Sequence, residues 1–343
     1  VSLSKTFRQK HKRKKVRGLF SDRKQTSFYV FYIAPVNFFA YSNRKRKITM
    51  DRVRRTISAN QAYRRGYYGE GVGVAVLDTG IFLHQDFEKR VVCFRDYING
   101  RTKPYDDNGH GTHIAGIIGG NGSISGGKYM GIAPKAHFIV VKILDQKGNG
   151  NTENVVESIR WLVAEKEKYK IRIVNISIGM VLEAESSERR RLLQAVDYAW
   201  DNGIVVVAAA GNNGPGENSV TVPGISRKII TVGCCDDTKE QIGVSRLKPD
   251  YSGQGPTDHC IVKPELVVPG TNIISCSITG EYVKKSGTSM AAPIVSGCVA
   301  ILLSKYPRFS PAEVKLRLYE RALDLGMVPS KQGWGMVDIG RLL

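Results

Sequence analysis

The chain has 343 residues, 42% of them hydrophobic, and can therefore bury a substantial core. Its formal net charge of +20 would suit a nucleic-acid partner, but residues 1–66 hold 19 of the 51 Lys and Arg and only two of the 31 acidic residues. The remaining chain, with 32 bases and 29 acids, is nearly neutral. The charge therefore gives no reason to expect specific nucleic-acid binding by the main part of the chain.

Residues 1–49 read as a basic N-terminal extension that is disordered or not part of the native protein, because Met50 opens a segment leading directly into the first core strand. The folded domain is then expected at residues 50–343. A second interpretation makes residues 1–42 a signal segment, since a basic lead precedes the apolar stretch 28–42, although Pro35 and Asn37 interrupt that stretch. The basic segment is also suited to contact with acidic surfaces such as DNA or anionic lipid.

From residue 71 onward, short apolar runs alternate with helical stretches. Buried strands are expected at residues 72–77, 138–143, 171–176, 204–209, 229–232 and 266–268. Helices are expected at residues 110–118, 152–168, 187–201 and 289–305, and from a capping box at Ser310–Glu313 through Arg321. This alternation predicts one α/β domain, a doubly wound and mostly parallel sheet with helices on both faces.

The cysteines favour a cytoplasmic location. There are six, Cys93, Cys234, Cys235, Cys260, Cys276 and Cys298. Their spacing is too irregular for a disulfide scaffold and contains no paired zinc motif, so buried free thiols are expected.

Three glycine-flanked motifs carry candidate chemistry. Asp78 ends the first strand in AVLDTG, where open α/β sheets build their sites, although a turn aspartate is the simpler interpretation. Asp-Thr-Gly also occurs in aspartic proteases, which need two such motifs, and this chain has one. His110 lies in NGHGTHIAG; a metal pair with His113 is disfavoured because no Glu follows as in the zinc pattern and no third ligand is suitably spaced.

Ser289 lies in GTSMAAP at the expected start of a helix, where unpaired N–H groups could stabilise an oxyanion. Alone it could equally be a helix cap. Together, Asp, His and Ser in this chain order are the minimum set for nucleophilic acyl transfer.

The motifs AVLDTGI, GHGTHIAG and GTSMAAP resemble the three active-site signatures of the subtilisin-like serine proteases (subtilases, peptidase family S8), and the resemblance runs from about Ile57 to the C-terminus. It implies a serine endopeptidase with Asp78, His110 and Ser289 as its triad and with Asn212, in AAAGNNG, as the oxyanion-hole donor. The alternative is a catalytically silent subtilase-fold regulator, which is disfavoured because all four residues are present.

The same resemblance implies a protein or peptide substrate bound in extended conformation between two chain segments. The matching residues are Gly148, Asn149 and Gly150 on one side and Ser177, Ile178 and Gly179 on the other. Thr221 matches the floor of the family's specificity pocket, where a threonine predicts a shallower pocket suited to medium-sized side chains.

Two departures resemble the intracellular, propeptide-free bacterial branch of the family. The residues before the first strand do not look like the usual inhibitory propeptide. The loop 119–130, GGNGSISGGKYM, is poor in carboxylates, although Asp86 is present where a calcium ligand is expected. No cofactor and no metal ligand are therefore assigned; calcium is left possible.

Overall fold

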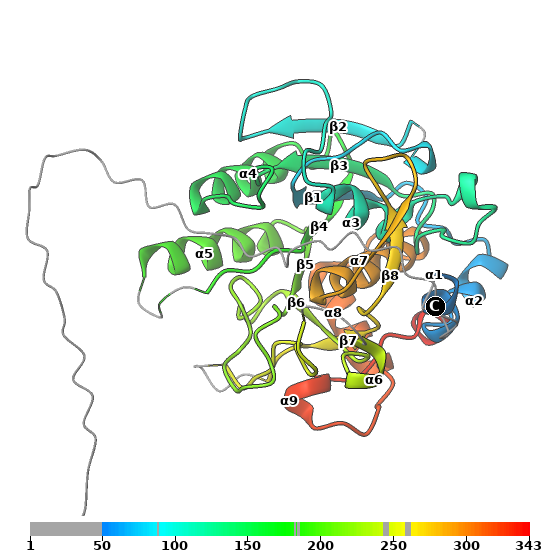
Figure 1. Cartoon of the computed structure of the whole chain (residues 1–343), viewed down its shortest axis with the longest axis vertical. Coiled ribbons are helices and arrows are strands. Elements are labelled where there is room, and N and C mark those ends of the chain that lie inside the picture. Colours follow the sequence, from blue (N-terminus) through cyan, green and yellow to red (C-terminus); the bar gives the residue numbers. More distant parts are fainter. Residues whose placement is uncertain (1–49, 88, 182, 184–185, 243–246, 258–261) are drawn as a thin grey trace, which may run out of the picture.

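The computed structural model describes residues 50–343 except residues 88, 182, 184–185, 243–246 and 258–261 (Figure 1). The predictions for residues 1–49, including the signal segment, lie outside the described residues. The described cysteines are free thiols, as expected; Cys234, Cys276 and Cys298 are buried, whereas Cys93 and Cys235 are only half-buried.

Seven parallel strands form the central sheet in the order β2-β3-β1-β4-β5-β6-β7. They are β1 (Gly73–Asp78), β2 (Val91–Asp96), β3 (His137–Lys142), β4 (Ile171–Ile176), β5 (Val205–Ala209), β6 (Ile230–Cys234) and β7 (Leu266–Val268). A separate antiparallel hairpin joins β8 (Ile273–Cys276) to β9 (Tyr282–Lys285). The predicted α/β class is confirmed.

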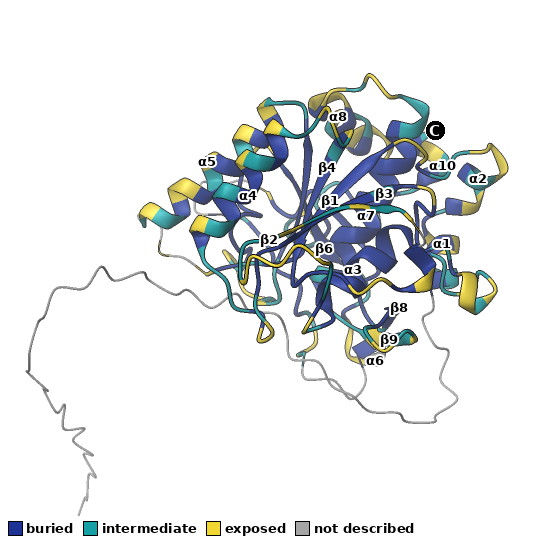
Figure 2. Cartoon of the chain, turned by 90° about the horizontal axis from the view of Figure 1, so that it is seen from above, coloured by how far each residue is buried: buried dark blue, intermediate teal, exposed yellow. Residues whose placement is uncertain are grey.

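The longer helices lie on the two faces of this sheet. They are α3 (His110–Gly119), α4 (Thr152–Ala164), α5 (Ser187–Asp201), α7 (Thr288–Lys305) and α8 (Pro311–Arg321). The short ones are α1 (Met50–Thr56), α2 (Ala59–Arg64), α6 (Lys239–Ile242), α9 (Pro329–Gln332) and α10 (Ile339–Leu342), with 3₁₀ turns η1 (Gln85–Phe87) and η2 (Ser123–Ser125). Helices α3 and α7 pack against each other on one face, while α4 and α5 pack together on the other (Figure 2).

Helix α7 is apolar all round because it runs through the core. Its 18 residues would be long and apolar enough to cross a membrane, but 83% of that stretch is buried inside the fold. In Figure 2 α7 and the central strands are almost uniformly buried, whereas α4 and α5 expose their outer sides. The interior position of α7 fixes the residues at its N-terminus relative to the sheet.

Most predicted elements match within one or two residues, and the differences have local causes. Helix α4 ends at Ala164 instead of residue 168, because the chain reverses through turns in which Lys170 adopts a left-handed φ of 49° before β4. Strand β2 was not predicted; it is an edge strand whose residues are half-buried or exposed, and its apolar run, residues 91–94, is followed by the charged Arg95 and Asp96. The capping box at Ser310 and Glu313 is confirmed, with both of its hydrogen bonds present.

Strand β1 is the point where the strand order reverses, because its neighbours are β3 on one side and β4 on the other. All seven strands are parallel, so their carboxyl ends lie at one edge of the sheet. Crevices outside the carboxyl ends at such a switch point are the usual ligand sites of open α/β sheets. The end of β1 is Asp78.

Candidate active site

Asp78 and His110 form a buried hydrogen-bonded pair. Both Asp78 oxygens lie near the ring nitrogen Nδ1 of His110, at 2.8 Å for Oδ1 and 2.9 Å for Oδ2. Neither residue is more than 2% exposed. Because a carboxylate only accepts, His110 Nδ1 donates in this pair, and Nε2 is the ring nitrogen that takes no part in it. The backbone N–H of Thr79 also donates to Asp78 Oδ1 at 2.8 Å and helps to hold the carboxylate.

A second carboxylate, Asp106, holds the start of the helix that carries His110. Asp106 accepts hydrogen bonds from the backbone N–H groups of Asn108, Gly109 and Thr112 and from the Thr79 and Thr112 hydroxyls. Burial alone would raise the pKa of Asp106, but the donors from Thr112, Gly109 and Asn108 outweigh it and lower the pKa. The N-terminus of α3 is thus anchored by a charged acceptor.

The glycine after His110 is required by close packing of this helix on the strand end. A Cβ built on Gly111 would lie 2.2 Å from the carbonyl oxygen of Gly80 and 3.2 Å from Cβ of Asp78. No side chain fits there. The flanking glycines in the His motif therefore serve to bring the imidazole up to Asp78.

Asn212 and Thr288 connect the loop after β5 to the N-terminus of α7. Asn212 Oδ1 accepts two hydrogen bonds from Thr288, one from its backbone N–H at 3.0 Å and one from its hydroxyl at 3.1 Å. The Thr288 hydroxyl in turn accepts the N–H of Gly211 at 3.1 Å. Because these donors occupy the amide oxygen, the Asn212 NH₂ group is the end of the amide that is left to donate elsewhere.

Gly287, just before Thr288, has a φ of 141°, and a Cβ there would meet Asn212 Nδ2 at 3.3 Å. A side chain at this position would be strained and would crowd the Asn212 amide. Steric fit therefore requires glycine at the first position of the Gly-Thr-Ser sequence.

The hairpin leading to Ser289 is tied to the His110 segment. Lys285 Nζ donates to the Gly109 carbonyl at 2.9 Å, and His113 Nε2 lies 3.1 Å from the Val283 carbonyl. Burial lowers the pKa of Lys285 to about 8, although Asp106 and Asp78 act in the opposite direction. His110 and His113 therefore contact different groups, the Asp78 carboxylate and the Val283 carbonyl.

The segments predicted to bind substrate follow the two strands that flank β1. Gly148, Asn149 and Gly150 lie after β3, in a turn closed by an Asp145–Asn149 backbone hydrogen bond, and Asn108 Nδ2 donates to the Gln146 carbonyl of the same turn at 3.0 Å. Ser177, Ile178 and Gly179 follow β4 directly. The structure therefore puts one segment on each side of Asp78.

Thr221 lies against the second of these segments. Met180 and Val222 exchange two backbone hydrogen bonds of 2.9 Å, which bring the chain around Thr221 alongside Gly179. Its hydroxyl donates to the Ala210 carbonyl at 3.3 Å, and its side chain fills the space that a Cβ on Gly179 would need. Thr221 is thus placed between Gly179 and the Asn212 loop.

The loop 119–130 and Asp86 do not fit a calcium ion. Calcium takes six to eight oxygen ligands. Asp86 Oδ1 already accepts the Ser123 hydroxyl at 3.1 Å, and Oδ2 accepts the Tyr282 hydroxyl at 2.8 Å. Its other close side chains offer the nitrogen of His84 and the sulfur of Cys276 in place of oxygen.

Sequence reasoning missed the supporting residues Asp106, Thr288 and Lys285. Asp106 had a local signal, an aspartate four positions before His110 at a helix start. Thr288 and Lys285 had none, because their partners are 76 and 176 positions away.

The chain was also compared with known proteins. The family described as the subtilase family matches residues 69–335. Serine protease AprX of Bacillus subtilis (strain 168) is 39% identical over 295 residues, covering 80% of this chain and 67% of AprX. Subtilisin DY of Bacillus licheniformis is 33% identical over 273 residues, covering 79% of this chain and 90% of that protein.

Further matches come from another relative and from solved structures. The minor extracellular protease Epr of Bacillus subtilis (strain 168) is 31% identical over 284 residues, covering 82% of this chain and 40% of Epr. The solved structures of the S41 psychrophilic protease and of sphericase each have a TM-score of 0.67 and 30% identity, covering 79% of this chain and 92% of theirs.

Proposed function

This chain belongs to the subtilase family and is a serine endopeptidase of the subtilisin type, and from that premise we propose that Ser289, His110 and Asp78 carry out its chemistry. The observation that supports the assignment most directly is the pair of contacts, 2.8 and 2.9 Å, between His110 Nδ1 and the Asp78 carboxylate. They hold the tautomer in which Nε2 can accept a proton.

In the acylation step, Ser289 Oγ attacks the carbonyl carbon of the scissile peptide bond while His110 Nε2 takes the hydroxyl proton. The tetrahedral intermediate collapses when the C–N bond breaks, and His110 gives the proton to the leaving amine. Water then attacks the acyl-enzyme by the same route, with His110 as base, and Ser289 is regenerated. Asp78 stabilises the imidazolium formed in each half-reaction.

The negative charge that develops on the substrate oxygen needs donors already in position. We assign this role to the Asn212 NH₂ group and the backbone N–H of Ser289 at the start of α7. Support comes from the two hydrogen bonds by which Thr288 holds Asn212 Oδ1, since they orient the amide before any substrate arrives. Pre-oriented donors cost no reorganisation during the reaction.

The substrate is proposed to be a protein or peptide in extended conformation. Its backbone would pair with Gly148, Asn149 and Gly150 on one side of Asp78 and with Ser177, Ile178 and Gly179 on the other. The Thr221 side chain fills the space beside Gly179, and we propose that it makes the specificity pocket shallower, which favours medium-sized side chains before the cleaved bond. Profiling with a peptide library checks this: a strong preference for Phe or Tyr at that position contradicts it.

Labelling with a fluorophosphonate probe tests the catalytic assignment. The wild-type chain should be labelled at Ser289, and the Ser289→Ala variant should take no label. The Ser296→Ala variant is the matched control, because Ser296 lies on the same helix but is buried and bonded to Asn175. A wild-type chain that folds but takes no label would instead support the catalytically silent regulator.

The cellular location of the enzyme can be tested directly. The cytoplasmic location favoured by the free thiols stays a prediction, and the relative named as extracellular supports the secreted alternative. Probe labelling of the cytosol and of the culture medium of the source cells decides between them.

A further inference from the structure

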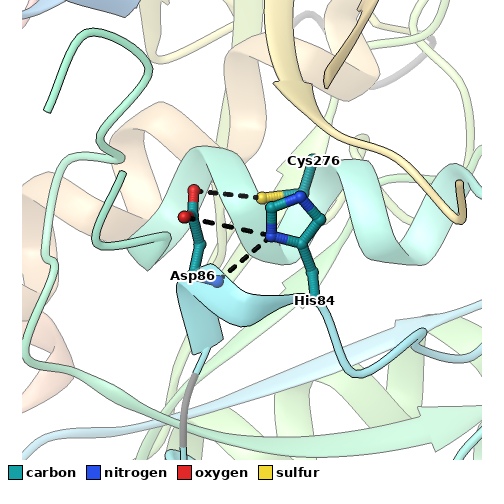
Figure 3. A group of neighbouring side chains, drawn as sticks. All are labelled: His84, Asp86 and Cys276. Carbon is teal, nitrogen blue, oxygen red and sulfur yellow. Dashed lines mark hydrogen bonds and ion pairs between the residues drawn. The ribbon is translucent and has the colours of Figure 1, made fainter. Parts of the chain in front are cut away.

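Three side chains outside the proposed catalytic group converge beneath the β8–β9 hairpin: His84, Asp86 and Cys276 (Figure 3). One potential ligand atom of each lies within 4.8 Å of the others. All three residues are at most 2% exposed. The first two follow β1 closely, while the third ends β8, so the group joins chain segments 190 positions apart.

The hydrogen bonds of His84 hold the tautomer that a metal ligand needs. Its Nδ1 accepts the backbone N–H of Asp86 at 3.1 Å, so this nitrogen is unprotonated. Nε2 lies 3.2 Å from the Glu281 carbonyl and therefore carries the proton that it donates there. A histidine whose ring N–H is held by a backbone carbonyl, with the other ring nitrogen unprotonated, is the usual arrangement around metal sites; in His84 that second nitrogen accepts the Asp86 N–H.

Asp86 lies between the other two groups. Its Oδ1 is 3.9 Å from His84 Nδ1, and its Oδ2 is 3.7 Å from Cys276 Sγ. Ligand atoms around a tetrahedral zinc ion are about 3.3–3.8 Å apart, as its bond lengths require. The two distances, each to a different Asp86 oxygen, lie at or just above this range, and all three ligand atoms lie within 4.8 Å of one another. The hydroxyls of Ser123 and Tyr282 orient the carboxylate from outside the group, as second-layer partners do.

In the absence of a metal, the S–H group of Cys276 donates a hydrogen bond to Asp86 Oδ2, with 3.7 Å between sulfur and oxygen. A divalent cation would replace that proton as the positive partner of the buried carboxylate. Such exchange is how thiol sites generally couple metal binding to proton release.

We propose that His84 Nδ1, an Asp86 oxygen and Cys276 Sγ form a binding site for a borderline or soft divalent cation, Zn²⁺ or Cd²⁺. On binding, the S–H bond breaks, an S–metal bond forms, and the proton leaves to solvent; nothing is oxidised or reduced. The Asp86 N–H···Nδ1 hydrogen bond is exchanged for a nitrogen–metal bond. Sulfur and imidazole ligands select these ions, whereas Ca²⁺ prefers oxygen alone.

Such a cation would fasten together the two parts of the chain that carry the proposed catalytic residues. Asp86 is eight residues after Asp78, and Cys276 precedes Ser289 on the hairpin bonded to His113 and Gly109. Because the ligands are adjacent only in the folded chain, binding should stabilise the folded state. The prediction is independent of the catalytic assignment, since it concerns stability and spectroscopy.

The test uses the full chain carrying Ser289→Ala, which prevents self-digestion, freed of metal by chelation. Titration with Cd²⁺ should produce the ultraviolet charge-transfer band of a cadmium–thiolate bond, saturating at one equivalent in the difference spectrum against the Cys276→Ser variant. Zn²⁺ should displace Cd²⁺ and thereby remove the band, and Zn²⁺ added to the metal-free chain should raise Tm by a few degrees at saturation. Ca²⁺ should do neither.

Two further variants sharpen the result. Cys298→Ser removes a buried thiol outside the group and should keep both the band and the Tm shift. His84→Asn should weaken Cd²⁺ binding at least tenfold. The inference is overturned if Cys276→Ser, which retains a hydroxyl to donate to Asp86, shows the same band and Tm shift as the parent. The inference also fails if the parent shows no Cd²⁺ band, because the three side chains then form only a hydrogen-bonded cluster. It fails as well if Ca²⁺ raises Tm as much as Zn²⁺ does, because the stabilisation is then not selective for sulfur and nitrogen ligands.

Discussion

The Thr288 hydroxyl offers a quantitative test of how the Asn212 donor is held. Thr288→Val replaces the hydroxyl by a methyl group of similar size at a fully buried position. The change removes one of the two donors to Asn212 Oδ1 and deprives the Gly211 N–H of its acceptor. The Thr288 backbone N–H still holds Asn212 at 3.0 Å, so the amide is loosened but not released.

The structure sets the expected size of the effect. A buried hydrogen bond contributes about 1 kcal/mol net, and a buried N–H left without an acceptor costs about 1–3 kcal/mol, so the free energy of unfolding should fall by about 2–4 kcal/mol. If about 1 kcal/mol of that loss appears in the transition state, kcat falls roughly fivefold with KM unchanged. Asn212→Ala should cost far more. The expected size is the roughly 100- to 1,000-fold loss of kcat known for the equivalent donor in subtilisin.

A double-mutant cycle of Thr288→Val and Asn212→Ala, measured by steady-state hydrolysis of a chromogenic peptide, is the assay. If the hydroxyl works through Asn212, Thr288→Val should cause no further loss of kcat in the Asn212→Ala background. Thr271→Val is the matched control, because Thr271 is equally buried but its hydroxyl bonds Tyr251; it should lower stability and leave kcat unchanged. Equal losses of kcat in both backgrounds, or a change confined to KM, refute the reasoning.

Three further changes have definite expected outcomes. Asp78→Asn should lower kcat about 10⁴-fold, the size known for this carboxylate in triad enzymes, and unchanged turnover would remove Asp78 from the mechanism. Glu265→Ala deprives the buried Lys263 ammonium, 2.6 Å away, of its nearest counter-charge. The free energy of unfolding in urea should fall by about 3–5 kcal/mol, whereas a loss below 1 kcal/mol contradicts a buried charge pair. Burial lowers the pKa of Lys263 from 10.5 to about 8, so between those pH values the unfolded chain binds more protons and the Lys263 contribution to stability rises with pH. Lys263→Met should flatten that rise, and an unchanged pH profile of urea midpoints would contradict it.

Local sequence was sufficient for the parts of the fold that depend on neighbouring residues. The buried strands were predicted because both faces of a parallel strand are covered, which leaves a continuous apolar run such as that of β1. The start of α8 was predicted because a capping box is completed within four residues. The edge strand β2 was missed for the converse reason, since none of its residues is fully buried and its four apolar residues are followed by Arg95 and Asp96.

The motif residues Asp78, His110 and Asn212 were recognisable because each lies in a short glycine-flanked sequence whose backbone constraint is local. Gly111, for example, is required by the approach of its own helix to Gly80. The resemblance of these motifs to subtilases was confirmed by the family match over residues 69–335.

The α/β class, the family and the candidate catalytic groups could thus be read from local patterns in the chain. How those groups are held, and what surrounds them, depends on contacts between distant segments. The tertiary structure joins Thr288 to Asn212 and Cys276 to Asp86 across 76 and 190 positions. Such pairs leave no periodic or local trace, because the hydrogen bonds that define them exist only after the sheet and α7 have packed.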